Sequence, residues 1–128
     1  MFECLVLGDS IAVGVGQNLP TCETIAKVGL SSSQVLASVK KVSKDLVVVS
    51  VGSNDPRNPE LLRNVRALRA KLDAKYVIWL LPYDRSAAGV IEQVAGTYRD
   101  YLLDLRNYST NDGVHPKNYK DVAKELTK

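Results

Sequence analysis

The chain has 128 residues, of which 45% are hydrophobic, and this length suits one domain with a single hydrophobic core. The formal net charge is only +3 and the basic residues are spread along the chain, which gives no case for nucleic-acid binding. A single histidine, His115, excludes a histidine-rich metal site. No apolar run approaches the roughly 20 residues that a membrane span needs.

The first part of the chain alternates apolar runs with short helical segments. Residues 2–7 form an apolar run that ends at Gly8, and they predict a buried strand. Residues 11–18 predict one or two turns of helix. Residues 22–28 predict a second strand that ends at Gly29.

A second helix is predicted to begin at Ser31. Ser31 and Gln34 have the spacing of a capping box, and the apolar face that follows extends to Val42. Lys44 lies near the expected C-terminal end, where the helix dipole favours a cation. Residues 46–51 are almost continuously β-branched and predict the third strand.

The remaining elements repeat this alternation. Asn58 as N-cap and Pro59 at the first helical position predict a helix whose apolar face runs to Leu72. Residues 76–81 are apolar throughout and predict a fourth strand, which Pro82 ends. The rest of the chain predicts a helix over 87–95, a fifth strand over 101–105 and a closing helix over 116–126.

Five apolar strands separated by helical segments indicate a parallel sheet that is covered on both faces. Crossovers between parallel strands are right-handed, which favours one economical topology. We therefore predict a flavodoxin-like three-layer α/β/α sandwich with strand order 2-1-3-4-5 and a single domain over residues 1–128.

Polar motifs follow the predicted strands at their carboxyl ends, where open α/β sheets bind ligands. The first and third strands are neighbours in the proposed order, so the segments that follow them should meet. The histidine comes far downstream, and the last helix could return it to the same edge. The motifs are Gly8-Asp9-Ser10, Gly29, Gly52-Ser53-Asn54-Asp55 and Asp112-Gly113-Val114-His115.

These residue types together suit acyl transfer. Ser10 at the start of a helix is a plausible nucleophile, because the helix N-terminus favours a developing negative charge. His115 would be its general base, and Asp112 would orient the imidazole ring. The Asn54 amide and the bare backbone N–H of Gly29 would bind the oxyanion.

Each motif taken alone also has a structural interpretation as a strand exit, a helix cap or a turn. Gly8, Gly14 and Gly16 after the first strand suggest a phosphate loop as a further alternative, but no Lys-Ser/Thr pair follows and the dinucleotide fingerprint is incomplete. We therefore expect no cofactor and no metal, and we disfavour a flavin- or phosphate-binding domain. Cys4 and Cys22 are expected to be buried free thiols.

Three polar residues follow Pro82 at the carboxyl end of the fourth strand. They are candidates for lining the substrate pocket, and a solvated loop is an equal alternative. The three are Tyr83, Asp84 and Arg85.

The motifs GDS at 8–10, GSND at 52–55 and DGVH at 112–115 resemble the sequence blocks of the SGNH (GDSL-like) hydrolases. The resemblance covers nearly the whole chain, although Gly29 lacks a fuller glycine-rich block and no segment is left for a lid. It implies that Ser10 is the nucleophile, His115 the general base and Asp112 the orienting acid. It also implies an oxyanion hole made of the N–H groups of Ser10 and Gly29 and the side chain of Asn54. The family implies hydrolysis of esters or thioesters without a metal.

The sequence thus predicts a serine-dependent hydrolase of carboxylic esters that forms an acyl-enzyme on Ser10. A chain without a lid suggests an open, shallow site, which suits a small acyl group such as acetyl on an exposed carrier such as a polysaccharide. The alternatives are a non-catalytic glycan-binding or structural module on the same fold, and a thioesterase- or lysophospholipase-type activity. The oligomeric state is not predicted.

The N-terminus bears on the compartment. It has no basic region, and its apolar stretch is too short for a signal peptide. We therefore expect a cytoplasmic protein, with release by lysis or incorporation into a viral particle left open.

Overall fold

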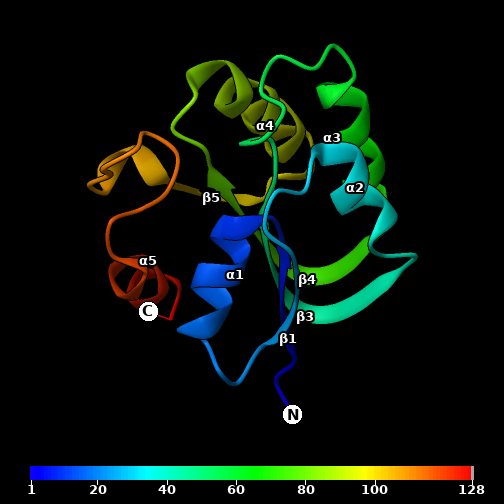
Figure 1. Ribbon diagram of the computed structural model, residues 1–128. Coiled ribbons are helices and arrows are strands. Elements are labelled where there is room, and N and C mark those ends of the chain that lie inside the picture. Colours follow the sequence, from blue (N-terminus) through cyan, green and yellow to red (C-terminus); the bar gives the residue numbers. More distant parts are fainter. Residues whose placement is uncertain (128) are drawn as a thin grey trace.

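A five-stranded sheet forms the centre of the molecule in the computed structural model, which describes residues 1–127 (Figure 1). The strand order is β2-β1-β3-β4-β5 and every neighbouring pair is parallel, so the predicted topology is confirmed. The strands are β1 (Cys4–Gly8), β2 (Glu23–Ala26), β3 (Val42–Ser50), β4 (Leu72–Leu81) and β5 (Tyr101–Asp104).

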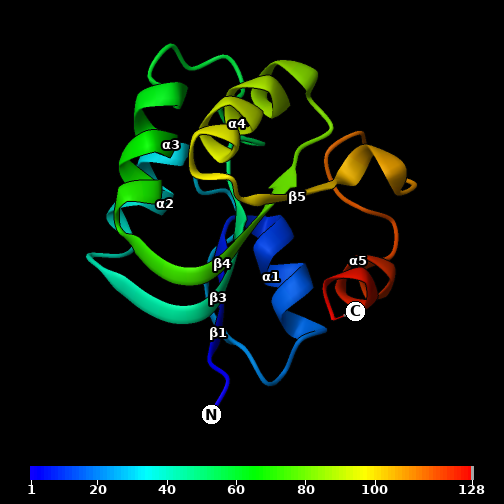
Figure 2. The same cartoon turned by 180° about the vertical axis from the view of Figure 1, so that it is seen from behind.

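Helices cover both faces of this sheet, as Figure 2 shows from the reverse side. One face carries α1 (Ser10–Gln17) and α5 (Tyr119–Leu126). The other face carries α2 (Ser32–Ala37), α3 (Leu61–Ala70) and α4 (Arg85–Tyr98). A short 3-10 helix, η1 (Leu105–Asn107), follows β5. No helix within residues 1–127 is long and apolar enough to cross a membrane.

Successive residues of the buried strands contribute to two separate cores. Leu7 and Val49 pack with α2, α3 and α4, while Val6 and Val48 pack with α1 and α5. All four side chains are fully buried, because side chains alternate across a strand and both faces of the sheet are covered. This explains why the strands are continuously apolar in the sequence.

The end of β1 lies unusually close to β3. Gly8 pairs with Ser50, and a Cβ atom on Gly8 would overlap the carbonyl oxygen of Ser50. The φ angle of Gly8 is +147°, which an L side chain rarely adopts. Glycine at this position therefore lets the chain leave β1 beside β3 and enter α1 at Ser10.

Several predicted helix boundaries are wrong. The cap at Ser31 is confirmed by a 2.9 Å hydrogen bond from its N–H to Oε1 of Gln34, but the helix ends at Ala37. Val42 instead begins β3 and pairs with Leu72, which begins β4. Both apolar residues fit a helical face in the sequence, but here they begin two adjacent strands that extend beyond the start of β1.

Two helices begin later than predicted, because the expected start residues serve in turns. The side chain of Asn58 accepts a hydrogen bond from the N–H of Glu60, and α3 begins only at Leu61. Pro116 forms an isolated bridge with Thr110, so the closing helix does not begin there. Asn118 caps α5, accepting from the N–H of Lys120.

Cys4 and Cys22 form a disulfide bond, so the expectation of free thiols is wrong. The parallel register pairs Leu5 with Glu23, which places the two preceding residues side by side. Their Cα atoms are 4.8 Å apart, a separation that a disulfide spans readily. The bond ties the start of β1 to the segment that enters β2.

Candidate active site

Ser10 is the first residue of α1, directly after the turn that leaves β1. Asp9 caps this helix, its Oδ1 accepting from the N–H of Ile11 (3.1 Å) and from the Oγ of Ser50 (2.9 Å). Asp9 is fully buried, and its Oδ2 has no hydrogen-bond partner among the described residues. Burial raises the pKa of this carboxyl above its ordinary value, against the lowering effect of its hydrogen bonds.

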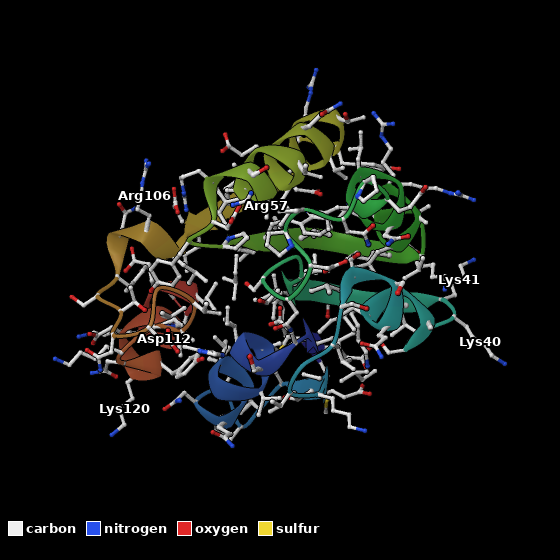
Figure 3. The ribbon with its side chains drawn as sticks, turned by 45° about the horizontal axis from the view of Figure 1, so that its top comes forward. Lys40, Lys41, Arg57, Arg106, Asp112 and Lys120 are labelled. Carbon is white, nitrogen blue, oxygen red and sulfur yellow. A yellow bond between two sulfur atoms is a disulfide. The ribbon has the colours of Figure 1, made fainter. Side chains whose placement is uncertain are left out.

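His115 reaches Ser10 from the loop between η1 and α5. Its Nε2 lies 2.8 Å from the Oγ of Ser10, and its Nδ1 lies 2.7 Å from Oδ2 of Asp112. The structure therefore brings three of the predicted site residues into one hydrogen-bonded chain. Figure 3 shows Asp112 on this loop, on the side of the molecule where α1 and α5 lie.

The loop holds the Asp112 carboxylate tightly. Oδ1 accepts from the backbone N–H groups of Val114 (2.9 Å) and His115 (2.8 Å). Gly113, at a φ angle of +76°, allows the chain to fold back in this way. The hydrogen bond from the His115 backbone, followed by that from its side chain, holds the pKa of Asp112 well below the ordinary range. The carboxylate is therefore ionised at neutral pH and can fix the imidazole.

The site is open to solvent. The side chain of His115 is 41% exposed and that of Asp112 is 55% exposed. Both side chains can therefore be reached from solvent.

Asn54 and Gly29 lie in the segments that follow β3 and β2. The Nδ2 of Asn54 donates to the carbonyl oxygen of Leu30 (2.8 Å). An amide nitrogen carries two hydrogens, so this contact uses one of them. Gly29 lies three residues beyond the end of β2 and is exposed, with a φ angle of +84°. Leu30 therefore links the two predicted oxyanion donors.

The three candidates after β4 make contacts within the protein. The hydroxyl of Tyr83 donates to the carbonyl oxygen of Tyr108 (3.0 Å), and burial raises its pKa. Asp84 caps α4, and Arg85 binds both carboxylate oxygens of Asp104 at 3.0 Å. Their role toward a substrate stays a prediction.

Tyr119, the first residue of α5, is a neighbour of the site that the sequence analysis missed. Its pKa is raised to about 12, first by burial and then by the negative charges of Asp9 and Asp112. A Cβ atom on Gly14 would lie 2.6 Å from its ring. Gly14 therefore makes room for this ring, and Gly16 likewise makes room for Thr24 of β2. These two glycines let α1 pack closely against α5 and β2. Close packing is therefore a structural reason for the glycines that suggest a phosphate loop in the sequence.

Within residues 1–127, no three side chains of His, Cys, Asp and Glu gather as metal ligands would. No protein-family profile matches the chain, and no curated protein sequence does.

Solved structures of low sequence identity share the whole architecture. An aryl esterase from M. smegmatis is 14% identical with a TM-score of 0.72, over 98% of this chain and 96% of that one. A carbohydrate acetylesterase from Sinorhizobium meliloti is 13% identical with a TM-score of 0.64, over 99% of both chains. The catalytic domain of a peptidoglycan O-acetyltransferase from Streptococcus pneumoniae is 17% identical with a TM-score of 0.59, over 96% and 87%. The chain therefore has the fold of the SGNH (GDSL-like) hydrolases.

Proposed function

We propose that the protein is a serine-dependent hydrolase of carboxylic esters. The observation that supports this proposal is the hydrogen-bonded chain from Asp112 through His115 to Ser10. A serine hydroxyl is a weak nucleophile until a neighbouring base takes its proton, and imidazole is the usual base near neutral pH. A protein that only bound glycans would have no need of this chain.

In the proposed mechanism, Ser10 Oγ attacks the carbonyl carbon of the ester while its proton passes to Nε2 of His115. The carbonyl π bond opens and its electron pair moves to the oxygen, giving a tetrahedral oxyanion. When the intermediate collapses, the bond to the alcohol oxygen breaks and His115 gives its proton to the departing alcohol. Ser10 then carries the acyl group.

Water completes the cycle: it takes the role of the nucleophile, and Ser10 takes the role of the leaving group. It attacks the acyl carbon as His115 takes one of its protons, and the second tetrahedral intermediate releases the carboxylic acid as Ser10 regains a proton. Asp112 keeps the imidazole oriented and stabilises its cationic form. No metal or cofactor takes part in either half.

The oxyanion would be bound by the N–H groups of Ser10 and Gly29 and by the Asn54 amide. The N-terminus of α1 adds its positive partial charge, because the first N–H groups of a helix have no partner within it.

We propose a small acyl group, acetyl in the first place, on an exposed carrier such as a polysaccharide. The exposed side chain of His115 supports an open site. Two structures of the same fold are described as a carbohydrate acetylesterase and a peptidoglycan O-acetyltransferase, which agrees with this substrate class. A thioesterase or lysophospholipase would need more apolar pocket for its acyl chain.

The test combines a covalent probe with turnover. The wild type should hydrolyse p-nitrophenyl acetate and gain one fluorophosphonate adduct, which peptide mapping should assign to Ser10. Ser10→Ala should lose both properties while keeping the melting temperature. A panel from acetate to octanoate, with acetylated glycans, should give the highest kcat/KM for acetyl esters. No adduct and no turnover would favour a non-catalytic module on the same fold.

A further inference from the structure

Two consecutive residues of the loop after β3 hold the segment after β2. Asn54 Nδ2 donates to the carbonyl oxygen of Leu30 (2.8 Å). The carboxylate of Asp55 accepts from both the backbone N–H (2.9 Å) and the Oγ (2.5 Å) of Ser32. The segment that carries Gly29 is therefore bound at two points only two residues apart.

The attachment at Ser32 is the stronger of the two. Ser32 is 1% exposed, and its Oγ also accepts from Nδ2 of Asn64 in α3 (2.9 Å). The Oδ2 of Asp55 accepts a further hydrogen bond, from Nδ2 of Asn58 (2.9 Å). Asp55 thus accepts three hydrogen bonds. A carboxylate can do so because both of its oxygens are acceptors and neither carries a hydrogen.

Gly29 itself has little to hold it in place. It is exposed, and a Cβ atom built on it would meet nothing within 4 Å. Its N–H is positioned through the chain on either side, where the N–H of Lys27 donates to the carbonyl oxygen of Gly8 (3.1 Å) and Leu30 is held by Asn54. The Asn54 amide is bound to Leu30, the residue after Gly29. The distance and angle between the two predicted oxyanion donors therefore depend on the segment from Gly29 to Ser32.

We propose that Asp55 is a positioning residue that acts through Ser32 to fix the Gly29 N–H relative to the Asn54 amide. This inference rests on the proposed ester hydrolysis at Ser10. Donors that are already in place need no reorganisation when negative charge develops, and a misplacement near 1 Å can cost about 100-fold in rate. Asp55 itself touches no reacting atom.

The first test is Asp55→Asn. The amide keeps the size of the side chain, but its nitrogen cannot accept a hydrogen bond, so contacts to Ser32 or Asn58 are lost. With p-nitrophenyl acetate we expect kcat to fall about 10–100-fold and KM to change less than about 3-fold, because the donors act on the transition state. A kcat within 2-fold of the wild type would overturn the inference.

Asp100→Asn is the matched control. Asp100 also accepts three hydrogen bonds, two from the guanidinium of Arg69 and one from Nε1 of Trp79, but it lies at the opposite edge of the sheet. We expect this variant to lower the melting temperature and to leave kcat unchanged. A loss of kcat equal to that of Asp55→Asn would mean that general loosening explains both.

A double-mutant cycle with Asn54→Ala separates positioning from structure. If Asp55 sets the Gly29 N–H relative to the Asn54 amide, the double variant should lose less than the product of the single losses, because this relation no longer matters once the Asn54 amide is gone. Losses that multiply would overturn the role of Asp55. Ser32→Ala removes only the contact between Asp55 and the Oγ of Ser32. It should lower kcat less than Asp55→Asn does, and its loss should also combine with that of Asn54→Ala to less than their product. It replaces Asp55→Asn in the cycle if that variant does not fold.

The outcomes also separate this inference from the proposed function. A wild type without Ser10-dependent turnover would overturn both. Ser10-dependent turnover with multiplying losses would overturn the role of Asp55 alone.

Discussion

The Oγ of Ser10 and the Nε2 of His115 lie 2.8 Å apart although 105 positions separate them in the chain. The contact follows from helix packing, since α1 begins at Ser10 and α5 packs beside α1 on the same face of the sheet. The Tyr119 ring occupies the space beside Gly14 and so brings the two helices close. The loop that precedes α5 therefore ends at the carboxyl edge of β1.

Asn54→Ala tests the proposed oxyanion donor. We expect kcat to fall about 10²–10³-fold in the hydrolysis of p-nitrophenyl acetate, the usual loss for one such donor. Asn54→Asp, which keeps the size but replaces N–H groups with an acceptor, should lose at least as much. Steady-state kinetics of both variants would contradict this role if kcat fell only a few-fold.

Asp112→Asn tests how the imidazole is oriented. One oxygen of the carboxylate accepts from two backbone N–H groups and the other contacts Nδ1 of His115. A carboxamide has a single oxygen, so it can accept at only one of these two places. We expect kcat to fall by up to roughly 10⁴-fold, as for an imidazole held in the wrong tautomer. Circular dichroism should show an unchanged fold. A loss below about 10-fold would mean that another group orients the ring.

The fold could be predicted because its strongest signal is local. Buried parallel strands are continuously apolar, and the right-handed crossover then leaves few possible orders. The helix boundaries could not be predicted in the same way. Val42 and Leu72 fit a helical face, and only the pairing of β3 with β4 assigns them to strands.

Part of the candidate site could be predicted from the sequence, because the proposed nucleophile, base and orienting acid each need a particular residue type. Ser10, Asp112 and His115 carry distinctive chemistry in recognisable motifs, and their contacts follow once the strand order is known. Tyr119 and the Asp55–Ser32 contact gave no such signal. A tyrosine in a helix or a serine at the start of a helix is common, and its role here depends on which segment packs against it.

Asp9→Asn should stabilise the protein at neutral pH. Burial raises the pKa of Asp9 in the folded state, so ionising this group costs folding stability. That cost is absent below the ordinary value of 3.8 and complete above the folded-state pKa. An asparagine keeps an oxygen for Ile11 and Ser50 without the charge.

We expect Asp9→Asn to raise the stability by about 1 kcal/mol at pH 7, with the gain shrinking toward pH 4. Thermal unfolding of both proteins across this range measures the difference, which corresponds to about 3 °C in melting temperature. A variant less stable than the wild type at pH 7 would show that the Asp9 charge is compensated.

Gly14→Ala should destabilise the protein by about 1–3 kcal/mol, because the added methyl overlaps the Tyr119 ring. Gly89→Ala is the matched control, since Gly89 also lies in a helix but a Cβ there meets nothing within 4 Å. It should stabilise by up to about 1 kcal/mol through helix propensity. In a Tyr119→Ala background, Gly14→Ala should no longer destabilise. Chemical denaturation of the four variants would contradict this if Gly14→Ala resembled Gly89→Ala.

Reduction of the bond between Cys4 and Cys22 should lower stability without lowering activity. The bond closes a loop with a sequence separation of 18, for which the restriction of the unfolded chain is worth about 3 kcal/mol. We expect reductant to lower the melting temperature by about 10 °C. Since Cys4 lies at the opposite end of β1 from Ser10, kcat at 25 °C should not change.

The double variant Cys4→Ala/Cys22→Ala is the control, and its melting temperature should not respond to reductant. The bond also bears on the compartment, because structural disulfides are typical of oxidising environments. Thiol titration of protein purified under alkylation measures the state directly. Two free thiols together with an unchanged melting temperature under reductant would show that the pairing of β1 with β2 holds this corner without a covalent bond.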